Sequence, residues 1–232
     1  MRDADTDTGA NATRAFPGEL MIWLSASFPV GGFAYSQGLE TAIEKGWVTD
    51  RDTLTDWLRA LLQHGSLRND LIFISLIQRA SGSAETHDLV ALAGAMQPSA
   101  ERHGETVSQG RSFILAYEAA WCVGPSPFAG LRDTATLPVA VAIAARRHTI
   151  CVDATLEAYA IALLNNLISA AIRLGVVGQF DGQRIVADLM VPLRAICCAT
   201  RAAGECDLGS ATWGADLAAM LHETQTTRLF RS

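Results

Sequence analysis

Apolar residues recur along most of the chain at spacings of three and four, which is the repeat of an amphipathic α-helix. The clearest stripe has the i, i+3, i+4, i+7, i+8 pattern and consists of Leu54, Trp57, Leu58, Leu61 and Leu62. We expect Thr49 to cap the helix that carries this stripe, because a threonine hydroxyl accepts a hydrogen bond from the first helical amides. No segment alternates apolar and polar residues as a half-buried strand does, so the pattern predicts an all-α protein.

The same periodicity, interrupted by glycine, proline and serine turns, predicts a series of helices. Their expected ranges are about 19–25, 37–45, 69–79, 85–96, 99–121, 153–174, 183–201 and 213–223, with further helices after residues 49 and 136. The predicted architecture is a single compact multi-helix domain over residues 15–232, with roughly eight to ten helices around a long apolar central helix. Residues 1–14 contain little that can be buried, and we expect them to form a disordered N-terminal tail.

Residues 154–177 are the most apolar part of the chain and raise the question of a membrane span. The polar and charged residues that interrupt them are Glu157, Asn165, Asn166, Ser169 and Arg173. These leave no uninterrupted apolar run of the ~18 residues that a transmembrane helix needs. We therefore expect no membrane span but a buried core helix, capped by Asp153 and ended by Gly175.

The composition narrows the class of protein. The chain has 232 residues, of which 50% are hydrophobic, so it can bury one core without disulfides or metals. Its formal net charge of −6, with no basic stripe, argues against nucleic-acid binding. Five cysteines without a CxxC pair, and an N-terminus without an apolar signal segment, favour a cytoplasmic protein with reduced thiols.

Motifs for nucleotide binding, nucleophilic catalysis and metal binding are missing from the sequence. Lys45, the single lysine, does not follow the glycine-rich loop of a P-loop. The five histidines are scattered and show no metal-ligand spacing on one helix face. We therefore predict no catalytic residue, no cofactor site and no metal site.

The pair His222 and Glu223 begins like the zinc motif H-E-x-x-H, but Thr226 stands where the second histidine would be. One interpretation is a helical metal-dependent hydrolase that uses His222 and Glu223. The other, which we favour, is a polar pair at the end of a surface helix.

The glycine-rich segment 30–40 contains two aromatic residues and a carboxylate, in Phe33, Tyr35 and Glu40, together with Gln37. A tight turn that leads into a helix would account for its glycines. Alternatively, the segment is a surface loop that presents an aromatic side chain and a carboxylate to a partner protein.

The C-terminal tail, at about 221–232, ends with Leu229 and Phe230 between two arginines, the first of which is Arg228. Chain ends are usually polar, so two bulky apolar residues indicate docking, either on the same domain or on another protein. Arginine and phenylalanine are enriched at interfaces, which favours another protein. Arg173, in the last turn of the central helix, either satisfies the helix-end carbonyls or faces a partner.

Several segments resemble, in order, the UreF family of urease accessory proteins. The segment at 29–40, PVGGFAYSQGLE, resembles the family signature, and 44–48 resembles its next element. The G-Q pairs within 177–183 and the segments at 207–210 and 222–232 resemble later blocks of the family. Thr226 departs from the tyrosine that is usual in the family, which puts one aromatic contact in doubt.

The resemblance implies an all-α, dimeric, non-catalytic scaffold that acts in urease maturation. Such proteins bind UreD (also called UreH), recruit the nickel-carrying GTPase UreG and dock with it on apo-urease, where nickel insertion accompanies GTP hydrolysis by UreG. The resemblance also implies that the tail becomes ordered mainly in the complex with UreD, and that Glu40, Arg173 and Arg228 contact partners. A generic helical adaptor unrelated to urease is the remaining alternative.

A role in regulating the GTPase could work by either of two mechanisms. The chain could supply an arginine finger, or it could hold UreG in one nucleotide state. We favour the second because of Glu40 and the acidic net charge. The predicted partner-binding residues are Phe33, Tyr35, Gln37, Glu40, Arg173, His222, Glu223, Arg228, Leu229 and Phe230.

Overall fold

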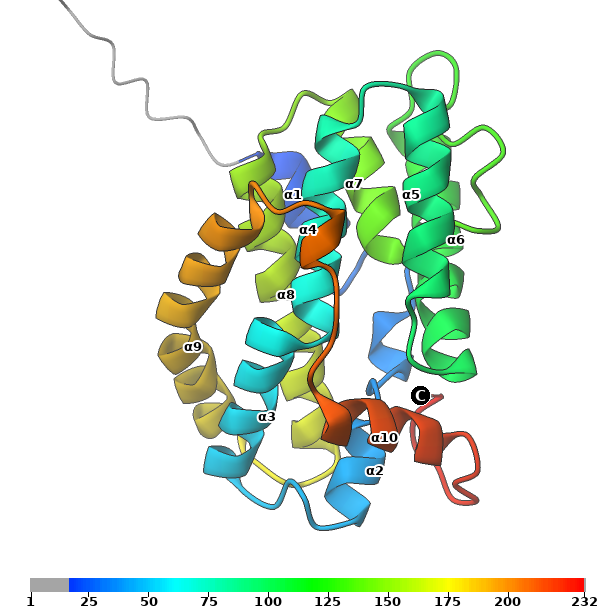
Figure 1. The fold of residues 1–232 in the computed structure, drawn as a ribbon. Helices are drawn as coiled ribbons and strands as arrows, with labels where there is room; N and C mark the ends of the chain where they lie inside the picture. The colour runs from blue at the N-terminus through cyan, green and yellow to red at the C-terminus, as the bar shows by residue number, and fades with distance from the viewer. Residues whose placement is uncertain (1–16, 232) are drawn as a thin grey trace, which may run out of the picture.

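The computed structural model describes residues 17–231, and helices are the only regular secondary structure in that range (Figure 1). The α-helices are α1 (Gly18–Trp23), α2 (Leu39–Glu44), α3 (Arg51–His64), α4 (Ser66–Arg79), α5 (Ser83–Ala95), α6 (Ala100–Ala120), α7 (Leu137–Arg147), α8 (Val152–Arg173), α9 (Gln179–Thr200) and α10 (Trp213–His222). Two short 3-10 helices are η1 (Gly32–Ala34) and η2 (Glu205–Asp207). The predicted all-α class is confirmed, whereas the expected disorder of residues 1–14 lies outside the described residues.

The long apolar helix α8 lies near the centre of the fold and contacts α4, α7 and α9 (Figure 1). Among the described helices it alone has the length and apolar composition of a membrane span, and 61% of that stretch is buried inside the protein. Its buried residues include Leu156, Leu164 and Leu167, which belong to the main hydrophobic core. The expected central core helix is therefore confirmed.

Two predicted helix caps are wrong in detail. Helix α3 is capped by Asp50 instead of Thr49, because the Asp50 carboxylate accepts the Thr53 amide at 2.9 Å and the Thr53 hydroxyl accepts the Asp50 amide at 3.0 Å. This reciprocal capping box satisfies two amides that helix geometry leaves free. Helix α8 begins at Val152, so Asp153 lies in its first turn and is not the cap.

The close approach of α6 and α7 depends on a glycine. A Cβ atom at Gly110 would lie 2.1 Å from the carbonyl oxygen of Ala135, just before α7 begins. The two helices pack closely in the interior only because position 110 has no side chain.

Helices α2 and α10, which are far apart in sequence, lie side by side (Figure 1). Gly38 precedes α2 with a φ of +79°, and a Cβ atom there would lie 2.7 Å from the backbone nitrogen of Ala219 in α10. This contact brings the glycine-rich segment 30–40 next to the C-terminus, although the two are far apart in sequence.

Candidate protein-binding site

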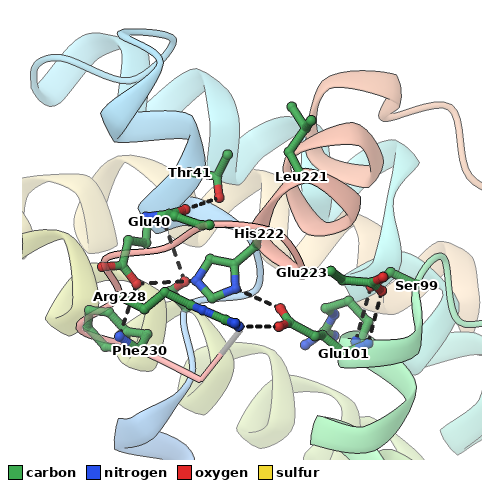
Figure 2. A network of polar contacts seen from close by, with 12 residues as sticks. Glu40, Thr41, Ser99, Glu101, Leu221, His222, Glu223, Arg228 and Phe230 are labelled. Atoms are coloured by element: carbon green, nitrogen blue, oxygen red, sulfur yellow. Dashed lines mark hydrogen bonds and ion pairs between the residues drawn. The ribbon is translucent and has the colours of Figure 1, made fainter.

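His222, the last residue of α10, lies fully buried between two carboxylates from different helices (Figure 2). Its Nδ1 atom is 2.6 Å from an oxygen of Glu101 in α6, and its Nε2 atom is 3.3 Å from an oxygen of Glu40 in α2. When both carboxylates are ionised, both contacts are hydrogen bonds only if the imidazole carries a proton on each nitrogen. His222 therefore joins α2, α6 and α10 in the interior of the protein.

The same two carboxylates hold the end of the chain. We call residues 224–231 the C-terminal strap. Glu40 accepts hydrogen bonds from the backbone amides of Leu229, at 2.6 Å, and Phe230, at 3.0 Å. The guanidinium group of Arg228 pairs with Glu101 (Figure 2). The Arg231 amide donates to the carbonyl of Ala34 at 2.8 Å. In the structure the strap thus lies against its own domain, and the expectation that it becomes ordered mainly with UreD stays a prediction.

The two apolar residues of the strap point in different directions. The Phe230 side chain is 3% exposed and packs beneath Arg173, whose guanidinium carbon lies 4.3 Å from the ring centroid. Leu229 is 64% exposed. Of the two docking possibilities, the structure shows Phe230 docked on its own domain, although the sequence favours the other, while Leu229 is exposed. Contact of either residue with a partner stays a prediction.

The segment 30–40 is largely folded inward. Among the four predicted site residues of this segment, Tyr35, Gln37 and Glu40 are buried, whereas the Phe33 side chain is 70% exposed. Positive φ angles of 56° at Gln37 and 79° at Gly38 turn the backbone towards the interior, and the Gln37 amide reaches Glu105 at 3.5 Å. The expectation of a surface loop is wrong for the three buried residues. Their contact with a partner remains a prediction.

Glu223 caps α6 from outside the helix. Its carboxylate accepts hydrogen bonds from the backbone amides of Ala100, at 2.8 Å, and Glu101, at 3.3 Å, where the positive end of the helix dipole lies. The interpretation of His222 and Glu223 as a polar pair at a surface helix end is wrong for His222, because α2 and α6 cover it. Both side chains are engaged in holding helices together.

A second polar group lies deeper in the protein and has no counterpart in the sequence-based predictions. Arg102 and Glu105 form an ion pair in which both side chains are at most 5% exposed, and Gln109 donates to Glu105 at 3.0 Å. The only sequence signal for this group was the presence of charged residues among apolar ones along α6. Both residues belong to α6, and loss of either partner would leave an uncompensated buried charge and so destabilise the fold.

Asp70 and Tyr159 form a neighbouring buried contact, with 2.8 Å between the tyrosine hydroxyl and the carboxylate. Burial raises the pKa of Asp70 from 3.8 to about 7, although the hydrogen bond from Tyr159 and the charge of Arg102 oppose the shift. Burial, together with Asp70, also raises the pKa of the Tyr159 hydroxyl well above its ordinary value.

Metal binding finds no support in this geometry. Within residues 17–231, no group of three His, Cys, Asp or Glu side chains is placed to hold a metal ion. Glu40 and Glu101 face different nitrogens of the His222 ring, so the three groups do not converge on one point.

Two hollows flank the strap and the segment 30–40. A cavity of about 530 Å³ lies between α1, η1 and α8, with Trp23, Phe28 and Leu163 in its wall. A cleft of about 520 Å³, which we call the strap cleft, is lined by Phe33, Arg173, Leu229 and other residues of η1, α6 and the strap. The exposed predicted residues Phe33, Arg173 and Leu229 are thus brought together at one place.

Comparison with known proteins gives a consistent result over the whole chain. Residues 48–190 match the family model described as UreF. The chain is 46% identical over 239 residues to the urease accessory protein UreF of Rhodopseudomonas palustris strain BisA53, with 100% of both chains covered. It is 45% identical over 218 residues to the proteins of that name from Methylorubrum populi, with 92% of this chain and 97% of the relative covered, and from Bradyrhizobium diazoefficiens, with 92% and 90% covered.

Proposed function

This chain belongs to the UreF family of urease accessory proteins, and on that premise we propose that it is a non-catalytic scaffold for nickel insertion into urease. It binds UreD (also called UreH), recruits the GTPase UreG and docks with both on apo-urease. It acts in the cytoplasm as a homodimer. Its own role in urease maturation is to hold these proteins in place, while UreG hydrolyses GTP.

The observation that carries this proposal is the way in which the strap is held. Glu40 and Glu101 fix its backbone and Arg228, yet Leu229 remains exposed beside the exposed Phe33. An apolar side chain on an ordered segment costs little conformational entropy when a partner covers it. This arrangement supports a protein interface more readily than a catalytic pocket.

Deletion of residues 228–232 tests the proposal. We expect the deletion to abolish co-purification of UreD or UreG while circular dichroism shows an unchanged helix content, because the strap adds no helix to the fold. Leu229→Ser is the finer test, and Val191→Ser is its matched control, since Val191 on α9 is equally apolar and 78% exposed. Recovery of both partners by the truncated chain would contradict the proposal.

For the GTPase, we propose that the chain holds UreG in one nucleotide state and does not supply a catalytic arginine. The support for this mechanism is not a direct contact between Glu40 and UreG, because Glu40 is buried and accepts a hydrogen bond from the strap. What supports it is that Arg228 is paired with Glu101 and is not free to reach a nucleotide. If Arg228→Ala leaves assembly of the complex normal but stops stimulation of GTP hydrolysis, the arginine-finger mechanism is correct instead.

The hydrolase alternative has less support. His222 has both ring nitrogens occupied by carboxylates and no exposed surface, and Glu223 is occupied by the α6 amides. A general base must reach a substrate proton within hydrogen-bond distance, which neither group does in this arrangement.

A further inference from the structure

The strap cleft has a charge opposite to that of the chain as a whole. The chain carries a formal net charge of −6, but the charged residues that line the cleft are Arg173 and Arg231, and no carboxylate lines it. The apolar part of its lining includes the exposed Phe33 and Leu229, and Ser108 and Ser112 of α6 contribute hydroxyl groups. The cleft therefore combines a basic and an apolar surface within about 520 Å³.

The two arginines have no acidic partner among the described residues, and they differ in this from Arg228, their neighbour. Arg228 is paired with Glu101. Within residues 17–231, Arg173 donates a hydrogen bond to the Ser169 carbonyl at 3.4 Å and lies over the Phe230 ring. The backbone amide of Arg231 is fixed by Ala34, and its side chain is exposed. Two guanidinium groups thus lie on one cleft, and no carboxylate of residues 17–231 pairs with either of them.

We propose that the strap cleft receives an acidic segment of a partner protein. Carboxylates of that segment bind Arg173 and Arg231, and an aliphatic or aromatic side chain between them packs against Phe33 and Leu229. Guanidinium groups bind carboxylates through two parallel hydrogen bonds, and stacking on Phe230 restricts the directions that Arg173 can take. This inference rests on the proposed scaffold function and adds the chemistry of the segment that the scaffold recognises.

Charge reversal at both arginines tests the inference, with purified UreD and UreG as probes. We expect the double variant Arg173→Glu, Arg231→Glu to bind either UreD or UreG roughly tenfold or more weakly than the unaltered chain does. High salt should reduce this difference in affinity. Arg173→Lys with Arg231→Lys should retain most of the affinity. The matched control is Arg184→Glu on α9, an exposed arginine that lies outside the cleft. Circular dichroism checks that each variant is folded.

A chemical crosslink identifies the segment itself. Lys45 is the only lysine of the chain, so Arg231→Lys introduces one new primary amine into the cleft. Carbodiimide treatment of the complex joins such an amine to a carboxylate in contact with it, and mass spectrometry then locates the joined residue. We expect an aspartate or glutamate of UreD or UreG that lies beside an apolar residue.

The outcomes separate this inference from the proposed function. If the unaltered chain binds neither UreD nor UreG, the scaffold function fails, and the inference fails with it. If the unaltered chain binds but the double charge reversal binds equally well, or Arg184→Glu is equally harmful, the inference alone is overturned. Loss of self-association in the double variant, with partner binding intact, would make a second copy of this chain the occupant and would also overturn it.

Discussion

Replacement of Glu40 by glutamine isolates the contribution of one carboxylate to the strap. In the native chain that carboxylate accepts two backbone amides of the strap and faces His222. Hydrogen bonds to charged groups contribute about 1.5–3 kcal/mol each. Glutamine keeps one carbonyl oxygen and loses the charge, so we expect the docked strap to lose about 2 kcal/mol, which is roughly a 30-fold shift towards the undocked state.

Amide hydrogen exchange measures this shift directly. The protection of Leu229 and Phe230 should fall roughly 30-fold in Glu40→Gln, while the amides of α4 in the core keep their native protection. Glu44→Gln, one turn later on the same helix and exposed, is the matched control and should leave the strap unchanged. Unchanged strap protection in Glu40→Gln would refute the reasoning, as would an equal loss of protection in α4, because the carboxylate would then stabilise the whole fold.

Two further predictions concern the interior. Burial raises the pKa of Asp70 from 3.8 to about 7 in the folded chain, so the folded state binds the proton more tightly than the unfolded state. The free energy of unfolding should therefore fall as pH rises from about 4 to about 7, by up to about 4 kcal/mol. Asp70→Asn should flatten this fall in urea titrations, and an unchanged pH profile would count against burial of the acid. Gly110→Ala should destabilise the fold by about 2 kcal/mol or more, since the new methyl group meets the Ala135 carbonyl. On the same helix, Gly104→Ala has open space and should stabilise by about 1 kcal/mol in thermal unfolding.

The parts of the fold that depend on local periodicity could be predicted from the sequence. The stripe from Leu54 to Leu62 lies on α3, and the apolar run after Asp153 lies on α8, because an amphipathic pattern specifies a helix without reference to the rest of the chain. Errors at the ends of these helices were small. Asp50 rather than Thr49 caps α3 because of two reciprocal side-chain hydrogen bonds with Thr53, which periodicity does not reveal.

The candidate site could be predicted only in part, because its contacts join residues that are far apart in sequence. His222 looked like a surface residue, since neither Glu101 nor Glu40 lies near it in the chain. Likewise, the sequence did not show that Glu40 would bind backbone amides of the strap. The apolar character of Leu229 and Phe230 indicated docking, but only the three-dimensional arrangement distinguishes the buried ring from the exposed side chain.

Because Gly38 packs against α10, the segment 30–40 completes its contacts only late in synthesis of the chain. The segment 30–40 emerges early from the ribosome, but Glu40 receives its amide donors, and Ala34 its backbone partner, only from residues 229–231. Domains acquire long-range contacts only when both halves of each contact exist. A chain that ends just before Leu229 therefore keeps all of its helices but lacks the donors to Glu40 and Ala34, and on the proposed scaffold function it would lack a complete recognition surface.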